Sequence, residues 1–281
     1  MDGLAVGNPS EGFPICLRAD GIKGVERMIN QMDATQKFSG KAEGYEKYRP
    51  SYPKELLDYL YQEVGVQENS VIADIGAGTG IFSRLLLERG SRVFCVEPND
   101  DMRRVARQKL QGYPSCTFVK ATAEHTLLDD RSVDFITAAQ AFHWFDQTAF
   151  AAECRRILRP GGKVVLVWNN REKDSTIIKE TYRICQEICP EFQGFSGGKE
   201  TPEKYQSFFW EGRYEERAFP NDQRMDLEGF LGRYLSASYA PSQEENRYFA
   251  FTKALTELFA SYQKGGAVTL PNQTRCYVGE V

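Results

Sequence analysis

The sequence predicts an α/β protein with a largely parallel sheet and helices on both faces. Over residues 54–168, short β-branched runs alternate with stretches whose apolar side chains recur at helical spacing. One predicted strand runs directly into the turn Gly76-Ala-Gly-Thr-Gly80, and a helix follows at once. Strand, glycine turn and helix in this order are typical of a nucleotide-type pocket, because glycine lets the backbone turn sharply and approach a ligand closely.

The first half of the chain alternates regularly between the two kinds of element. An amphipathic helix is predicted over residues 54–64, and Asn99 is placed to cap a later one. Strands are predicted over 71–75, 92–97, 116–120, 132–138 and 163–168, and further helices over 81–90, 100–110 and 148–158. A sharp turn is expected at 159–162, before the last of these strands. This alternation implies parallel strands joined by right-handed crossovers.

The pattern changes after residue 170. We predict helices over 174–188, 227–235 and 243–262, strands over 214–219 and 269–278, and a glycine-rich loop over 190–202. The stretch from 192 to 240 is rich in aromatic residues and arginine. We expect it to form a cap or substrate wall over the strand ends, although ordinary core would have the same composition.

Composition favours a protein of the reducing cytoplasm. The chain has 281 residues, a net charge of −4, seven cysteines and two histidines. Interspersed charges disfavour non-specific nucleic-acid binding, and no apolar run approaches the ~18 residues of a membrane span. Cys185 and Cys189 stand four apart on a predicted helix, but no second Cys/His pair accompanies them, so we expect no metal site. We also expect no secretory signal.

The N-terminal region has two parts. Residues 1–36 are glycine-rich with little periodicity, and we predict a loose leader there. The following segment, to Pro53, carries Tyr45, Tyr48, Arg49 and Tyr52. It could fold back as a lid over a ligand, or its tyrosines could only pack on the domain surface.

Two carboxylates indicate the kind of ligand. Asp74 stands two residues before the first glycine, and Ile81 occupies the place of the third glycine in the dinucleotide fingerprint. A carboxylate there would repel a pyrophosphate but suit a ligand with an amine or another positive charge. Glu97 ends the next strand, about 20 residues on, where nucleotide-binding folds accept the ribose hydroxyls. Glu124 and the loop 140–143 fall at the same sheet edge, so we expect one site there.

Four motifs follow one another in this order: Asp74-Ile-Gly-Ala-Gly-Thr-Gly80, Glu97, Thr122-Ala-Glu124 and Leu158-Arg-Pro-Gly-Gly162. Together they resemble the motifs of class I S-adenosylmethionine-dependent methyltransferases, and the methyltransferase type 11 family is most similar. The pairing of Tyr48-Arg-Pro-Ser-Tyr-Pro53 with Phe142-His-Trp144 is similar to the small-molecule subgroup that contains trans-aconitate methyltransferases. The resemblance covers residues 37–170 well and the rest loosely.

This resemblance implies a Rossmann-like sheet of seven strands, mostly parallel with the last strand antiparallel, helices on both faces and a C-terminal cap insertion. Residues 37–170 would be the core that binds S-adenosylmethionine, with an N-terminal lid segment. Residues 171–281 would form the cap and the final strands. The implied activity is methyl transfer to a small-molecule acceptor, with no nucleic-acid or membrane partner.

The resemblance also implies roles for individual residues. The loop Gly76, Gly78, Gly80, together with Asp74, would hold the methionine part of the cofactor, and Gln140 would lie near its amine. Glu97 would accept the ribose hydroxyls. The adenine would pack on Met102 and lie along Ala123 and Glu124, with Thr122 where many relatives have aspartate. The remaining implied contacts are Tyr45, Arg49 and Pro98.

Methyl transfer is an in-line displacement, so alignment of the reactants matters more than covalent help from the protein. His143 is the candidate base or substrate contact, the alternative being a histidine packed beside Trp144. A carboxylate acceptor would need no base and would bind arginine instead. The candidates are Arg49, Arg171, Arg224 and Arg233, which the sequence does not rank. A nucleotide-dependent oxidoreductase and a non-catalytic cofactor-binding protein are the alternative functions; the acceptor atom and the oligomeric state stay open.

Overall fold

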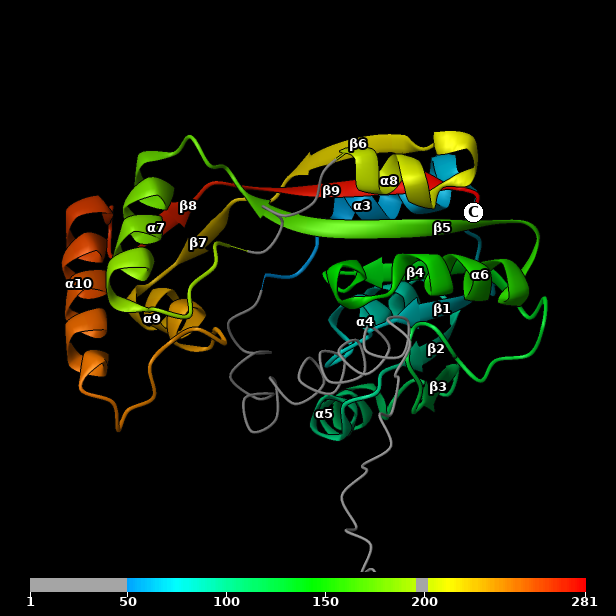
Figure 1. Ribbon diagram of the computed structural model, residues 1–281, viewed down its shortest axis with the longest axis horizontal. Helices are drawn as coiled ribbons and strands as arrows, with labels where there is room; N and C mark the ends of the chain where they lie inside the picture. Colours follow the sequence, from blue (N-terminus) through cyan, green and yellow to red (C-terminus); the bar gives the residue numbers. More distant parts are fainter. Residues whose placement is uncertain (1–49, 196–201) are drawn as a thin grey trace, which may run out of the picture.

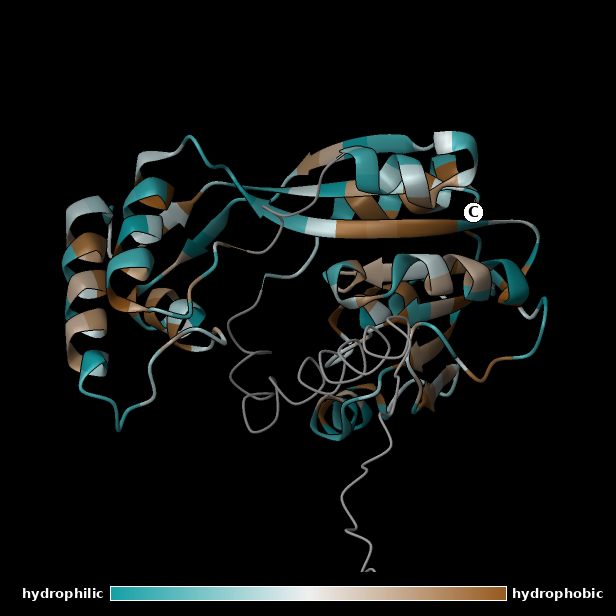
Figure 2. Ribbon diagram, in the orientation of Figure 1, coloured by the Kyte–Doolittle hydropathy of each residue, from teal (hydrophilic) through white to brown (hydrophobic). Residues whose placement is uncertain are grey.

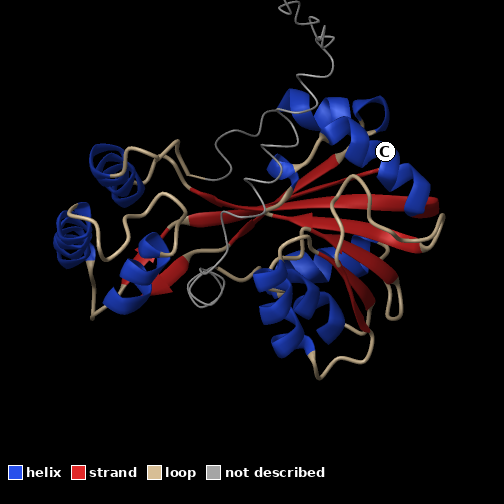
Figure 3. Cartoon of the chain, turned by 60° about the horizontal axis from the view of Figure 1, so that its bottom comes forward, coloured by secondary structure: helices blue, strands red, loops and turns tan. Residues whose placement is uncertain are grey.

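The computed structural model describes residues 50–195 and 202–281. Its centre is a seven-stranded sheet in the order β3-β2-β1-β4-β5-β9-β6 (Figures 1 and 3). All neighbouring pairs are parallel except those of β9, which runs antiparallel to β5 and to β6. This confirms the predicted mostly parallel sheet with an antiparallel last strand. The strands are β1 Val71–Ile75, β2 Arg92–Val96, β3 Cys116–Val119, β4 Val133–Ala139, β5 Leu158–Arg171, β6 Glu215–Pro220 and β9 Asn272–Gly279.

Helices cover both faces of this sheet. On one face lie α3 Lys54–Tyr59 with its continuation η1 Leu60–Val64, α4 Ile81–Glu88 and α5 Asp100–Leu110, which bury apolar side chains in a common core. On the other face lie α6 Gln147–Ile157 and α8 Pro202–Phe208, with a second core. Figure 2 shows the middle of β5 as a continuous hydrophobic band, as expected for a strand that is buried on both faces.

Local chemistry explains the boundaries of these helices. The Asn99 side chain accepts a hydrogen bond from the Met102 backbone N–H at 2.9 Å, so it caps α5 as predicted. Acidic residues occupy the first turn of α5 and basic residues its last turn, where they complement the helix dipole. The helix predicted over residues 54–64 is also confirmed, and it ends at Gly65, whose φ is +101°.

Strand β5 differs from its prediction at both ends. Val133 of β4 pairs with Leu158, but Phe135 pairs with Lys163, so residues 159–162 bulge out of the ladder instead of forming a separate turn. At its other end β5 continues beyond Trp168 to Arg171, because residues 169–171 pair with the start of β9. The prolonged β5–β9 ladder leads out of the main sheet.

A second lobe stands at the end of this ladder, at the left of Figure 1. It consists of α7 Thr176–Ile188, α9 Leu227–Leu235, α10 Arg247–Tyr262 and the two-stranded sheet of β7 Gln223–Met225 and β8 Val268–Leu270. These elements share their own apolar core, which includes Ile177, Cys185, Phe230, Phe251 and Leu255. The aromatic stretch from 192 to 240 is therefore not one cap: Tyr205 and Phe208 belong to the core of the main sheet, and Phe230 and Tyr234 to the second lobe.

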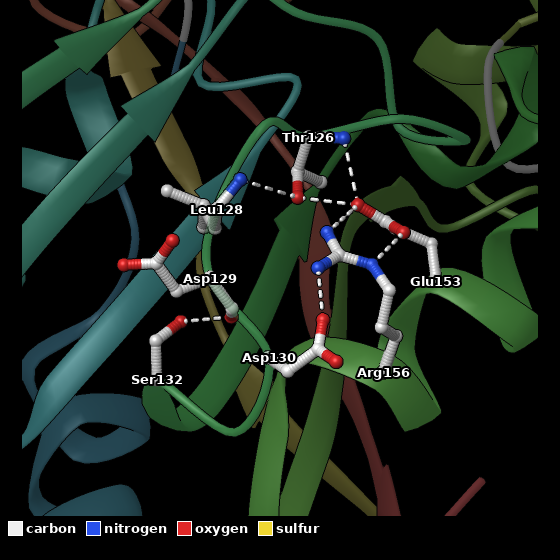
Figure 4. A network of polar contacts seen from close by, with 7 residues as sticks. All are labelled: Thr126, Leu128, Asp129, Asp130, Ser132, Glu153 and Arg156. Atoms are coloured by element: carbon white, nitrogen blue, oxygen red, sulfur yellow. Dashed lines mark hydrogen bonds and ion pairs between the residues drawn. The ribbon is translucent and has the colours of Figure 1, made fainter.

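A network around the buried Glu153 carboxylate links the loop after β3 to α6 (Figure 4). The Glu153 side chain is 6% exposed and accepts hydrogen bonds from the Thr126 backbone N–H and hydroxyl, at 2.7 and 2.5 Å. Arg156 donates to both Glu153 oxygens and to Asp130. Burial works to raise the pKa of Glu153, but hydrogen bonds from Arg156 and Thr126 outweigh it and hold the pKa at about 2.

Glu153→Gln is expected to destabilise the protein at neutral pH by on the order of 1–3 kcal/mol, because Arg156 and Thr126 lose a charged acceptor. The folded-state pKa lies below the ordinary 4.5, so this stabilisation is present above about pH 4.5 and is lost as pH falls toward 2. Thermal unfolding at several pH values should therefore show the two proteins converging in acid. Glu187→Gln, which alters an exposed pair with Arg183, is the control and should have little effect. Equal losses in both variants would contradict the role of Glu153.

Candidate active site

The glycine turn joins the end of β1 to the start of α4, and its three glycines have positive φ for different reasons. A Cβ on Gly76 would lie 2.6 Å from the Ala141 Cβ, so the loop after β4 packs against it. A Cβ on Gly80 would lie 2.8 Å from Leu110, at the contact with α5. A Cβ on Gly78 would meet no described protein atom closer than the Gly76 carbonyl oxygen at 4.0 Å. The Gly78 side of the turn is therefore open to a ligand.

Asp74 is turned into the fold at the base of this turn. Its side chain is 1% exposed. One oxygen accepts a hydrogen bond from the Ser83 hydroxyl at 2.5 Å and the other from the Thr137 hydroxyl at 2.7 Å. Burial raises its pKa to about 6 against the lowering effect of these two hydroxyls. Asp74 thus links β1 to α4 and β4, a role that the sequence analysis did not foresee.

Glu97 lies at the end of β2 and reaches the glycine turn. It is 8% exposed, and its carboxylate accepts hydrogen bonds from the Gly78 N–H at 3.0 Å and the Asn99 N–H at 2.8 Å. Arg103 of α5 donates to the carbonyls of Glu97 and Pro98 at 2.7 and 3.0 Å. Burial raises the pKa of Glu97, and the two N–H donors and the Arg103 charge oppose that rise. The predicted proximity of Glu97 to the glycine turn is therefore present in the structure.

The other residues predicted along the adenine lie around the next two strand ends. Met102 is buried in the first turn of α5, and Pro98 is half-buried before it. Ala123 is buried and Thr122 is exposed, in a short bridge with His125. The Glu124 carboxylate accepts a hydrogen bond from the Asp146 N–H at 2.9 Å, which ties this loop to the start of α6.

The loop after β4 contributes Gln140 and His143. Gln140 has a positive φ of +57°, and its side-chain amide donates to the Asn169 carbonyl at 3.1 Å. His143 is exposed, with its ring centroid 4.6 Å from that of Trp144 and 5.2 Å from that of Trp168. The ring contact with Trp144 agrees with the packing alternative, and a catalytic role for His143 stays a prediction.

Asn169, near the end of β5, connects several of these segments. Its oxygen accepts from the Thr274 hydroxyl at 2.5 Å and from Asn221 at 3.1 Å. Its amide donates to the carbonyls of Pro50 and Ser51 at 3.4 and 3.3 Å. The start of the described chain is therefore held at the carboxyl end of the sheet. Tyr52 packs edge-on against Phe82, whereas Tyr45 and Arg49 lie outside the described residues.

Arg171, the last residue of β5, projects into the aromatic part of the second lobe. Its guanidinium carbon lies 4.0 Å from the ring centre of Phe195 and 5.8 Å from that of Tyr234. Among the described residues, its buried Nε has no hydrogen-bond partner, and neither do the Tyr234 hydroxyl and the two polar side-chain atoms of Asn272. Asn272 pairs with Arg171 in the β5–β9 ladder. Buried polar atoms without partners are costly, and a bound polar ligand would explain them.

Neither a metal site nor a membrane span is found in the described part of the chain. No group of three histidine, cysteine, aspartate or glutamate side chains there could hold a metal ion. None of the described helices is long and apolar enough to cross a membrane.

Comparison with known families decides what kind of domain surrounds the glycine turn. Residues 73–166, from β1 to the middle of β5, match the family model described as methyltransferase domain. This part of the chain is similar to methyltransferase domains. Asp74, the glycine turn, Glu97 and Gln140 all lie within the matched residues, whereas Arg171 and the second lobe lie beyond the match.

Curated relatives are also similar to about half of the chain. An uncharacterised methyltransferase of Mycobacterium tuberculosis is 38% identical over 151 residues, which cover 54% of this chain and 59% of that protein. The chain therefore spans about three fifths of the length of that curated relative.

Solved structures show that the fold is shared. A protein from Anaeromyxobacter dehalogenans described as a type II methyltransferase superposes with a TM-score of 0.62 and 24% identity, over 83% of this chain and 98% of that one. A phosphoethanolamine N-methyltransferase from Haemonchus contortus, solved with phosphomonomethylethanolamine and S-adenosylhomocysteine, gives a TM-score of 0.54 and 16% identity, over 89% of this chain and 59% of that one.

Sequence reasoning missed Asn169 and the partners of Asp74. Ser83 and Thr137 are small hydroxyl residues on a predicted helix and a predicted strand, and nothing in their spacing relates them to Asp74. Asn169 stands just after a predicted strand end, where ligand sites of such sheets gather, and that position was the available signal.

Proposed function

We propose that this protein transfers a methyl group from S-adenosylmethionine to a small-molecule acceptor by in-line displacement. The observation that carries the proposal is the contact of Glu97 with the Gly78 N–H beside the open face of the glycine turn. The buried Glu97 carboxylate accepts hydrogen bonds from two backbone N–H groups. It lies next to the backbone of Gly78, which any side chain at that position would cover. The methyltransferase-domain match and the shared fold support this assignment.

The residues present fit S-adenosylmethionine on two counts. The open face of Gly78 gives a ligand close access to the backbone, and Glu97 is an acceptor for ribose hydroxyls. Met102, Pro98, Thr122, Ala123 and Glu124 would surround the adenine, and Gln140 would contact the methionine end. When bound, the cofactor supplies an electrophilic methyl group on a sulfonium.

Asp74 acts in this proposal as a positioning residue. Both of its oxygens accept hydroxyl donors from neighbouring elements. Asp74 therefore fixes the position of the junction between β1 and the glycine turn. Its negative charge also favours a cationic ligand at this strand end. A pyrophosphate would be repelled from the same place, which argues against a dinucleotide.

The acceptor would bind where the methyltransferase domain meets the second lobe. Arg171 carries a permanent positive charge there and has no carboxylate partner in the described part of the chain. In the same part of the chain, the Tyr234 hydroxyl and the Asn272 side chain have no hydrogen-bond partner among the described residues. The oxygens of an anionic acceptor would accept hydrogen bonds from Arg171, the Tyr234 hydroxyl and the Asn272 amide. This ranks Arg171 above Arg224, which is exposed on β7.

Alignment is the main catalytic device in this mechanism. Holding nucleophile, methyl and sulfur in line is worth ~7–11 kcal/mol if the near-attack geometry is kept. The protein achieves this by fixing the cofactor at the ends of β1 and β2 and the acceptor at the end of β5. An acceptor that is already an anion needs no base. An acceptor that must lose a proton would use His143, which is exposed at the end of β4.

Isothermal titration of the purified protein with S-adenosylhomocysteine tests the cofactor, with NAD as the competing ligand. We expect binding of the first and none of the second. Incubation with S-adenosylmethionine and a panel of anionic and neutral acceptors then tests methyl transfer. Binding of NAD alone would overturn the proposal, and cofactor binding without turnover over a broad panel would favour a non-catalytic role.

Arg171→Ala is expected to lower kcat/KM for an anionic acceptor about 10- to 100-fold, through the loss of a charge-assisted contact of ~1.5–3 kcal/mol. Its affinity for S-adenosylhomocysteine should not change. Arg224→Ala is the matched control, with the same change of charge at an exposed position of the second lobe. Steady-state kinetics that fall equally in both variants would exclude a specific role for Arg171.

A further inference from the structure

We propose that Cys95 and Cys116 form a reversible disulfide that weakens cofactor binding. Their sulfur atoms lie 3.4 Å apart on the neighbouring strands β2 and β3, and both thiols are free. The second half of the proposal rests on the proposed cofactor site, whereas the disulfide itself can be detected without any cofactor.

The register of the two strands places both cysteines on one face of the sheet. Cys116 pairs with Val93, two residues before Cys95, so the two side chains are diagonal neighbours beneath α4 and α5. A disulfide requires an S–S distance of about 2.05 Å, so the sulfurs must approach each other by about 1.4 Å. Rotation of the two side chains, together with a shift of β2 against β3, would supply this approach.

The chemical environment assigns different roles to the two thiols. Cys116 is half-buried and Cys95 is 1% exposed, so an oxidant reaches Cys116 first. The contact with Cys95 lowers the pKa of Cys116, and the positive charge of Arg107 acts in the same direction, whereas burial and the charge of Asp74 oppose them. A more exposed, more acidic thiol beside a buried resolving thiol is typical of a redox-sensitive pair.

The reaction needs a hydroperoxide as oxidant. The Cys116 thiolate attacks one peroxide oxygen, the O–O bond breaks, and hydroxide leaves and is protonated to water. The resulting sulfenic acid is attacked by the Cys95 sulfur: an S–S bond forms, the S–O bond breaks, and the leaving hydroxide takes the Cys95 proton as a second water. Two thiols are oxidised by two electrons and hydrogen peroxide is reduced to two waters.

The bond would act on the segment that positions both carboxylates of the proposed site. Cys95 pairs in register with Asp74 and stands two residues before Glu97. Ser83, the residue that donates to Asp74, also acts to lower the pKa of Cys95. Movement of Cys95 toward β3 would disturb the Asp74 contacts on one side and the position of Glu97 on the other.

The test treats the purified protein with hydrogen peroxide, blocks the remaining thiols and maps its peptides without reduction. We expect a Cys95–Cys116 cross-link that dithiothreitol removes. Titration with S-adenosylhomocysteine should show about tenfold weaker binding after oxidation, the equivalent of one charged hydrogen bond, with recovery on reduction. Cys116→Ser should bind normally and resist peroxide. Cys185→Ser, a buried cysteine of the second lobe, should remain as sensitive as the wild type.

Each result decides one part of the proposal. Absence of the Cys95–Cys116 peptide overturns the disulfide, whatever the binding data show. A cross-link with unchanged affinity overturns the coupling to the cofactor site. If the reduced wild-type protein does not bind S-adenosylhomocysteine, the proposed function is wrong, and so is the proposed effect of the disulfide on cofactor binding. The peptide map still shows whether the disulfide forms.

Discussion

Gly78→Val is expected to abolish binding of S-adenosylhomocysteine to a protein that still folds. Gly78 has a φ of +58°, and the space where a side chain would stand contains no described protein atom closer than 4.0 Å. A valine there would meet the cofactor instead of the protein. The backbone strain alone is ~1–2 kcal/mol, which a domain of ordinary stability tolerates. Titration calorimetry measures the binding, and circular dichroism the fold.

Gly265→Val is the matched control for this experiment. Gly265 has φ of +59° and equally open surroundings, but it lies in the turn before β8 in the second lobe. Both variants carry the same strain, and only Gly78→Val should lose the cofactor. Full binding by a folded Gly78→Val protein would show that the open face of the glycine turn is not the cofactor site.

Glu97→Ala is expected to weaken S-adenosylhomocysteine binding at least tenfold, because it removes charge-assisted hydrogen bonds worth ~1.5–3 kcal/mol. The same carboxylate also holds the Gly78 and Asn99 N–H groups, so part of the loss could come from a loosened turn. A double-mutant cycle with an analogue that lacks the ribose hydroxyls separates the two effects.

If Glu97 binds the ribose, the mutation should cost much less with the hydroxyl-free analogue than with S-adenosylhomocysteine. Glu97→Gln, which keeps the size and one acceptor oxygen, should fall between the wild type and Glu97→Ala. An equal loss of affinity for both ligands would show that Glu97 only supports the glycine turn. No loss of affinity for either ligand would show that Glu97 is not part of the cofactor site.

Most of the main sheet could be predicted because its signals are local. Parallel strands buried on both faces are continuous apolar runs, and α5, with its Asn99 cap, begins and ends at the predicted residues. The end of β5 could not be predicted in this way. Asn169 and Asn170 have low strand propensity, and they are strand residues because β9, about a hundred positions later, pairs with them.

The candidate site shows the same division. Glu97 and the glycine turn were expected together because both follow strand ends of one parallel sheet, and the Glu97–Gly78 contact agrees with this. The direction of the Asp74 side chain depends on Ser83 and Thr137, nine and 63 positions away. Likewise, the surroundings of Arg171 are supplied by Phe195 and Tyr234, which only the tertiary fold brings to it.

The connectivity of the second lobe constrains how the molecule can move. Within the described residues the chain passes between the main sheet and this lobe three times: after β5, between β6 and β7, and between β8 and β9. A single linker would act as a hinge, whereas three connections at one end of the sheet oppose rotation and favour small twists of the β5–β9 ribbon. An acceptor bound at Arg171 would therefore meet a largely preformed surface, and exchange of acceptor and product would proceed without wide opening of the two parts.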